Sequence, residues 1–252
     1  MLQAYIDDSC LGEGPVGLLA GWIDSAANWA KFSDDWAQAL SMSPRLRYFK
    51  FSEANSFTGE FSGWSGTRRD ERLRLLVNII ASYSPLGFAT AVPHDLYQEG
   101  FGNHPDKVLR YPYYFLFNGI VADVTRYLAG KGVTEKIDFI FDTQPGQTDA
   151  VWASWAKLRD AAPPDVRALF NDYPIFRDDK TTLPLQAADL SVGWLRIQAV
   201  SRINGTELEE PIWAEKSRHL QCIGRFWSRE MMQQLVDRAK PKPDAASAPQ
   251  SS

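Results

Sequence analysis

Leu183-Pro184-Leu185-Gln186-Ala187-Ala188-Asp189-Leu190 opens a stretch in which apolar residues recur at three- and four-residue steps. The pattern continues to Ala199, which predicts a helix with one apolar stripe over about residues 184–200. Asp189 lies four residues after Leu185, so its carboxylate is expected to point toward the buried side. Burying an ionised carboxylate is costly unless a cation or hydrogen-bond donors compensate it. The helix therefore predicts a buried acid that needs a partner.

A second carboxylate ends a short apolar run near the start of the chain, Ala4-Tyr5-Ile6-Asp7-Asp8-Ser9. We expect strands at Gln3 to Asp7, Val16 to Ile23, Arg45 to Phe51, Leu86 to Val92 and Lys136 to Asp142. We expect helices at about residues 29–40, 67–83, 117–128, 149–161, 184–200 and 219–238, and a loop at 55–66. This order of elements predicts an α/β fold, a mixed sheet flanked by helices.

Composition favours one large domain. The 252 residues are 44% hydrophobic and 13% aromatic, which is enough to bury a full core, and no internal stretch looks like a linker. We expect a single domain over residues 1–238 and a disordered tail over residues 239–252, which are rich in Pro, Ala and Ser.

Several features bear on the compartment. No signal sequence or apolar run of membrane-spanning length is present. Cys10 and Cys222 form no disulfide framework and no paired metal-ligand spacing. We therefore expect a cytoplasmic protein that does not interact with a membrane.

The net charge is weak evidence about which partners the protein binds. The net charge of −4 disfavours binding of nucleic acid through overall charge, but it leaves a local basic groove open. Two groups of basic residues are candidates for such a groove: Arg68, Arg69, Arg72 and Arg74, and Lys216, Arg218, Arg225 and Arg229. A solvated helix face explains each group without any partner.

Acidic residues fall where a sheet and a helix can present them to one place. Asp7 and Asp142 end predicted strands, Asp189 lies on the helix, and Glu53 follows the third predicted strand. Sites tend to form at strand ends of α/β sheets. Carboxylate oxygens with few histidines and no useful cysteines favour Mg²⁺ or Mn²⁺ over zinc. Such ions can support hydrolysis of phosphodiesters, although ion pairs and helix caps also hold acids in these positions.

Three motifs resemble the domain-of-unknown-function 3800 family: Tyr5-Ile6-Asp7-Asp8-Ser9, Phe139-Ile140-Phe141-Asp142 and Pro184-Leu185-Gln186-Ala187-Ala188-Asp189-Leu190. The resemblance runs from Ala4 to about Arg202, and the third motif is its most specific part. It implies a ribonuclease H-like fold with additional C-terminal helices. It further implies that Asp7, Asp142 and Asp189 are metal ligands and that Glu53 matches the family's early glutamate.

The resemblance leaves alternatives. Cys10 stands where the family commonly has glycine. Ribonuclease H-like folds generally carry the glutamate on the helix after the third strand, so Glu60 and Glu71 compete with Glu53. Their middle acid usually follows the fourth strand, and by the predicted strand count Asp95 competes with Asp142.

Two polar residues near the acids are candidates for contacting a substrate. Gln186 lies three residues before Asp189 on the same helix face, and Lys180 precedes the helix in a polar turn. A helix-start hydrogen bond and an exposed loop lysine are the structural alternatives for them.

Together these observations predict a metal-dependent nuclease or phosphodiesterase that uses one or two Mg²⁺ or Mn²⁺ ions. In this hypothesis Asp7, Glu53, Asp142 and Asp189 are the catalytic metal ligands. A non-catalytic interaction or scaffold protein of the same fold is the main alternative. Hydrolysis of a small phosphorylated molecule is a third.

Overall fold

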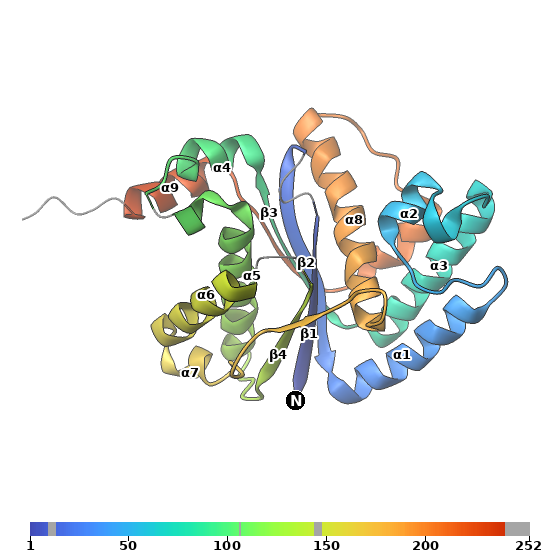
Figure 1. The fold of residues 1–252 in the computed structure, drawn as a ribbon, viewed down its shortest axis with the longest axis horizontal. Coiled ribbons are helices and arrows are strands. Elements are labelled where there is room, and N and C mark those ends of the chain that lie inside the picture. Colours follow the sequence, from blue (N-terminus) through green and yellow to red (C-terminus); the bar gives the residue numbers. More distant parts are fainter. Residues whose placement is uncertain (10–13, 106, 144–147, 240–252) are drawn as a thin grey trace, which may run out of the picture.

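A six-stranded mixed sheet forms the centre of the molecule (Figure 1). The computed structural model describes residues 1–9, 14–105, 107–143 and 148–239. The strands are β1 (Leu2–Ser9), β2 (Val16–Ser25), β3 (Leu86–Pro93), β4 (Ile137–Asp142), β5 (Ile175–Arg177) and β6 (Cys222–Phe226). They lie in the order β5-β4-β1-β2-β3-β6. β2 is antiparallel to β1 and β3, whereas the pairs β1–β4, β4–β5 and β3–β6 are parallel.

Helices cover both faces of this sheet. They are α1 (Ala26–Ser41), α2 (Phe51–Ser56), α3 (Gly66–Tyr83), α4 (His94–Phe101), α5 (Pro112–Gly130), α6 (Thr148–Ala161), α7 (Pro164–Arg167), α8 (Leu183–Asn204) and α9 (Arg229–Ala239). Short 3₁₀ helices are η1 (Gly59–Phe61), η2 (Lys107–Arg110) and η3 (Ile212–His219). In Figure 1, α4, α5, α6, α7 and α9 lie on one side of the sheet and α1, α2, α3 and α8 on the other. The expected α/β fold with a mixed sheet is therefore confirmed.

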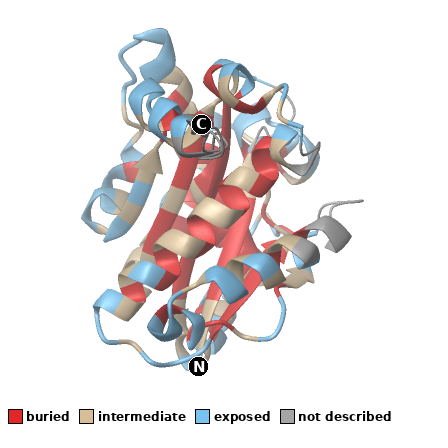
Figure 2. Ribbon diagram, turned by 90° about the vertical axis from the view of Figure 1, so that its left-hand side faces the viewer, coloured by how far each residue is buried: buried red, intermediate tan, exposed pale blue. Residues whose placement is uncertain are grey.

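Alternating side chains of the central strands divide the core in two. On β1, Ala4 and Ile6 pack on the face that α5 covers, whereas Tyr5 packs on the face that α8 covers. Phe139 and Ile140 of β4 alternate in the same way, as successive residues of a strand do. Figure 2 shows the strands as a buried layer behind helices whose outer residues are exposed.

The predicted strand at Arg45 to Phe51 is wrong. Residues 45–50 form an irregular segment, and Phe51 begins α2. Its apolar residues are buried, which produced the strand-like pattern, but its backbone N–H groups bond to helices instead of a neighbouring strand. Leu46 donates to the Leu40 carbonyl at 2.9 Å, and Phe49 and Phe51 donate to side chains of α8.

The helix predicted over residues 219–238 is only partly correct, because β6 occupies its first part and α9 its second. The strand pairs with the outer edge of β3, from Gly87↔Cys222 to Ala91↔Phe226. The Gly87 N–H donates to the Gln221 carbonyl at 2.8 Å, which fixes the start of this pairing. Without β6 the outer edge of β3 would be unpaired. Pairing with a strand so distant in sequence is not visible in local periodicity, so the sequence predicted a helix here.

The ends of the chain add two findings. Cys10 and the predicted tail after Ala239 lie outside the described residues. None of the helices in the described ranges is long and apolar enough to cross a membrane.

Candidate functional site

Two of the predicted acids lie side by side at one end of the sheet. Parallel pairing of β1 with β4 places Ile6 opposite Phe141, so the next residues, Asp7 and Asp142, are neighbours where β4 ends, while β1 continues to Ser9 beside β2. The side chain of Asp7 is buried, and that of Asp142 is half-buried. Asp7 Oδ1 accepts the N–H of Asp8 at 2.8 Å. The topology of the sheet is therefore what brings these residues together.

Helix α8 brings the third acid to the same place. It packs across β1 and β2, and Asp189 is 7% exposed. Its Oδ2 atom accepts the N–H of Phe51 at 2.5 Å, and its carboxylate is close enough to Asp7 for its charge to raise the pKa of that residue. A glycine allows the close approach of Phe51, because a Cβ at Gly193 would lie 2.1 Å from the Phe51 ring. The predicted buried orientation of Asp189 is thus observed.

Two further charged residues belong to the site and were missed in the sequence. Lys50 Nζ forms an ion pair with Asp179 Oδ2, and the Asp179 N–H donates to Asp142 Oδ1 at 3.2 Å. Asp179 is buried, and the Lys50 side chain is 30% exposed. A lysine between two buried phenylalanines was the available signal for Lys50, whereas the polar turn at Asp179 offered none. We call Asp7, Asp142, Asp179 and Asp189 the acid cluster.

Burial and mutual repulsion perturb these carboxyl groups. Burial, with the charges of Asp189, Asp8 and Asp142, raises the pKa of Asp7 well above its ordinary value. Burial raises the pKa of Asp189 to about 7, although Lys50 and the Phe51 N–H oppose the rise. Both acids are therefore costly to ionise in the folded protein.

Asp142 and Lys50 respond to the same surroundings. Burial and the negative charge of Asp179 raise the pKa of Asp142. The charge of Lys50 and hydrogen bonds from the backbone N–H groups of Asp179 and Thr143 lower it, and the net change is a rise. Burial alone would lower the pKa of Lys50, but Asp189, Asp179 and Asp7 together raise it. Lys50 is thus held as a cation by the cluster.

The cluster carries more negative charge than its lysine can balance. One ammonium faces four carboxylates, and the Asp7–Asp189 pair is the most deeply buried part. Protons or a cation must supply the missing positive charge. Two carboxylates suit Mg²⁺, which is commonly held by one or two protein carboxylates while water and phosphate complete its shell.

A fully assembled protein cage is not present. Among the described residues, no three His, Cys, Asp or Glu side chains are arranged so that they could hold a metal ion together. Lys50 forms an ion pair with Asp179, and Asp142 Oδ1 accepts two backbone N–H groups, whereas Asp7 and Asp189 each accept one backbone N–H. The residues therefore fit a divalent ion anchored at two points.

Glu53 has a local structural role in the turn after α2. Its Oε1 atom accepts the Tyr48 hydroxyl at 3.0 Å, and its Oε2 atom accepts the Glu60 N–H at 2.8 Å. A Cβ at Gly59, whose φ is +51°, would lie 2.1 Å from Glu53 Oε2. Both oxygens therefore accept hydrogen bonds from the segments on either side of α2.

The competing acids lie in other surroundings. The Glu60 carboxylate accepts hydrogen bonds from the guanidinium and the backbone N–H of Arg47. Glu71 lies on the exposed side of α3. Asp95 is exposed in the first turn of α4, where it accepts the Leu96 N–H at 2.7 Å. With the false strand removed, β4 is the fourth strand described, and Asp142 ends it.

Gln186 links two segments to α8. It is fully buried, and its Oε1 atom accepts from Trp36 Nε1 at 2.9 Å and from the Phe49 N–H at 3.1 Å. Its amide nitrogen donates to the carbonyls of Asp179 and Lys180 at 3.0 and 3.3 Å. All of these groups serve the protein, so Gln186 positions the segments that carry Lys50 and Asp179.

Lys180 is exposed, and its Nζ lies 4.9 Å from the centre of the Tyr48 ring. This contact is a cation–π arrangement at the protein surface. The side chain lies on the turn that also carries Asp179, so it stays a candidate for contacting a substrate.

Many of the predicted basic groove residues have internal partners. Arg72 is buried and donates to the carbonyls of Met42 and Pro44. Four others pair with acids: Arg69 with Asp70, Arg218 with Glu210, Arg225 with Asp123 and Arg229 with Glu99. These pairings reduce the positive charge that either group can offer to a nucleic acid.

In comparisons with known proteins, no protein-family model matches this chain, and no curated protein matches it. The resemblance noted in the sequence therefore depends on its three motifs.

Proposed function

We propose that this protein is a metal-dependent phosphodiester hydrolase with a ribonuclease H-like fold, and that the acid cluster is its active site. The observation that carries the proposal is the buried pair Asp7–Asp189, whose negative charge Lys50 does not balance because its ion pair is with Asp179. Three acids lie on the first strand, at the end of the fourth strand and on α8. These are the places that the resemblance implies.

In this proposal Asp7 and Asp189 hold a Mg²⁺ or Mn²⁺ ion, and Asp142 stands beside them. The chemistry that such an ion supplies when bound is Lewis-acid polarisation of a phosphodiester and its attacking water. Lys50 contributes a fixed positive charge near the phosphate, and Asp179 holds its ammonium in place. The Phe51 N–H fixes the orientation of the Asp189 carboxylate.

A hydrolysis assay tests the proposal. Labelled single- and double-stranded RNA and DNA are incubated with the full chain and Mn²⁺, with EDTA as the metal-free control. We expect Asp7→Asn and Asp189→Asn to lose at least ~10²-fold in rate, since each removes part of the group that stabilises the transition state. Asp165→Asn, on the exposed helix α7, is the matched control. Undiminished hydrolysis by both site variants would exclude this active site.

A non-catalytic scaffold is the second candidate, and one observation favours it. Lys50 already places a cation among the acids, and within the described part of the chain no three acidic, histidine or cysteine side chains are arranged to hold a metal ion. A scaffold should bind neither Mn²⁺ nor a phosphodiester at this site. Hydrolysis of a small phosphorylated molecule is a third candidate. Measuring substrate binding at increasing salt concentration distinguishes it from nuclease activity, because only polymer binding weakens steeply with salt.

A further inference from the structure

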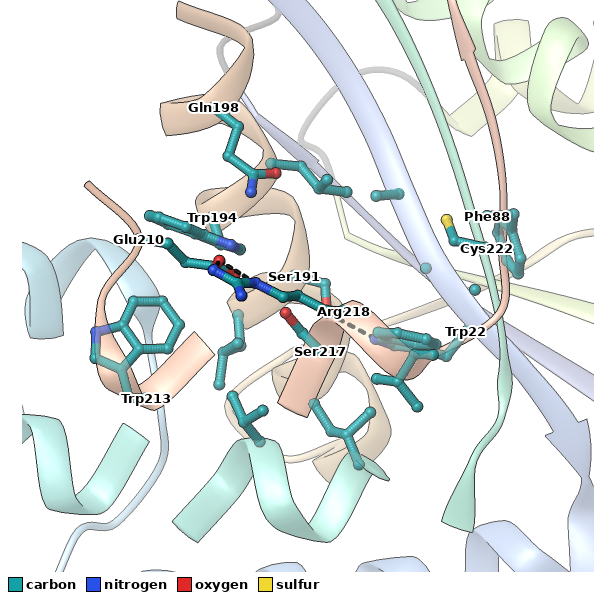
Figure 3. Close-up of a pocket in the computed structure, with 18 residues that line it drawn as sticks. Trp22, Phe88, Ser191, Trp194, Gln198, Glu210, Trp213, Ser217, Arg218 and Cys222 are labelled. Carbon is teal, nitrogen blue, oxygen red and sulfur yellow. Dashed lines mark hydrogen bonds and ion pairs between the residues drawn. The ribbon is translucent and has the colours of Figure 1, made fainter. Parts of the chain in front are cut away.

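A cavity lies beside α8, and none of the acid cluster residues lines it (Figure 3). It has a volume of about 250 Å³ and is enclosed by α8, α3, η3 and strands β2, β3 and β6. Its walls are mostly aliphatic and aromatic, with three tryptophans: Trp22, Trp194 and Trp213. Ligand sites are typically apolar cavities with a few placed polar groups, and this cavity has that character.

One tryptophan in the wall has an unmet hydrogen bond. Trp194 is 8% exposed, and within the part of the chain that the structure describes its Nε1 atom has no acceptor. The neighbouring Trp22 differs, because its Nε1 atom donates to Ser191 Oγ at 2.7 Å. A buried N–H without a partner costs on the order of 1–3 kcal/mol. In Figure 3 the indole nitrogen of Trp194 points toward the middle of the lining side chains.

The mouth of the cavity carries no unbalanced charge. The Arg218 guanidinium is paired with the Glu210 carboxylate, and both residues line the cavity. Charge therefore gives no preference for an anion or a cation. An apolar cavity of about 150 Å³ holds benzene, so the larger volume here has room for two fused rings.

From these features we infer that the cavity binds a neutral, planar heteroaromatic molecule of two fused rings whose ring acceptor takes the Trp194 Nε1–H. The tryptophan and aliphatic walls supply the apolar contact with the rings. The free N–H supplies the directional contact. This site is separate from the acid cluster and does not depend on the proposed hydrolase activity.

Two probes of nearly equal shape test the inference. Quinoline has a ring nitrogen that can accept a hydrogen bond, whereas naphthalene has none. Each is titrated into ¹⁵N-labelled full chain while the tryptophan indole N–H signals are followed by NMR. We expect quinoline to shift the Trp194 signal in a saturable manner and to bind roughly fivefold more tightly than naphthalene, as one neutral hydrogen bond allows.

A variant of Trp194 separates the hydrogen bond from the apolar contact with the rings. Trp194→Phe keeps an aromatic wall but removes the N–H, so quinoline should then bind no better than naphthalene. Trp152→Phe, an exposed position on α6, should keep the preference. The wild-type titration decides the question even if a variant fails to fold. No saturable response of Trp194 would overturn the inference and assign the N–H to water, and equal affinity for both probes would exclude the acceptor contact.

Discussion

At the scale of single residues, the main issue is how the protein tolerates buried negative charge. Asp7 and Asp189 are nearly inaccessible to water, and the charge of Asp189 raises the pKa of Asp7. Lys50 is attracted to this pair but forms its ion pair with Asp179. The pair therefore needs either a shared proton or a bound cation. The dependence of the protein's stability on pH and on divalent metal distinguishes these two states.

The stability of the metal-free protein should depend on the charge of Asp189. Burial raises its pKa to about 7, whereas an unfolded aspartate titrates near ~3.9. Between these values the folded protein holds a proton that the unfolded chain has lost, so the free energy of unfolding falls as pH rises through this window. In EDTA, urea unfolding should show that Asp189→Asn gains stability relative to wild type from pH 5 to pH 8. Parallel curves would contradict this prediction, and Asp165→Asn serves as the control.

Lys50 should be essential for stability because it faces acids on several sides. Removing one partner of a buried ion pair costs roughly 3–5 kcal/mol, and we expect about 2–3 kcal/mol for Lys50→Met because its side chain is 30% exposed. Urea unfolding at pH 7 measures the change. Lys180→Met, an exposed lysine on the neighbouring turn, should be nearly neutral. A similar loss in both variants would show that the effect is not specific to the acid cluster.

At the scale of elements, α8 organises the site by binding irregular backbone. Gln186 holds the Phe49 N–H and the carbonyls of Asp179 and Lys180, and Asp189 holds the Phe51 N–H. The segments that carry Lys50 and Asp179 therefore bond to one helix. This arrangement explains how side chains about 130 residues apart in sequence meet at one point.

Gly193 tests the close contact between α8 and α2. Alanine normally stabilises a helix relative to glycine by about 1 kcal/mol. At this position its Cβ would lie 2.1 Å from the Phe51 ring, so we expect Gly193→Ala to destabilise the protein instead. Gly130→Ala at the end of α5, where a Cβ meets nothing within 4 Å, is the matched control and should be neutral or stabilising. Thermal unfolding measures whether each variant is stabilised or destabilised relative to wild type. A stabilised Gly193→Ala variant would contradict the close contact with Phe51.

Gln186 tests whether the site depends on this helix for its shape. Gln186→Leu leaves the Trp36 Nε1–H and the Phe49 N–H without their acceptor, at about 1–3 kcal/mol for each buried group. We expect a loss of stability without any substrate, measured by urea unfolding. Gln38→Leu on the exposed side of α1 should change little. An unchanged stability of Gln186→Leu would contradict this structural role.

At the scale of the whole molecule, the sequence predicted what depends on local pattern. The strand that Asp142 ends and the buried side of α8 were visible in the local sequence, so Asp142 could be placed at a strand end and Asp189 on a buried helix face. Lys50 was hidden, because a segment bonded to side chains of α8 has the same apolar pattern as a strand. The false strand also shifted the strand count and made Asp95 a competitor of Asp142. Long-range backbone pairing was the missing information.

The central claim is that Asp7 and Asp189 together bind a divalent cation, and thermal unfolding in EDTA and in millimolar Mn²⁺ tests it most directly. A ligand bound only to the folded state at about 100 times its Kd stabilises by about 2.7 kcal/mol, which for a chain of this size raises the unfolding midpoint by roughly 5–10 °C. We predict such a rise for wild type and Asp165→Asn, and its loss in Asp7→Asn and Asp189→Asn. An equal rise in all four proteins, or none in wild type, would contradict the claim.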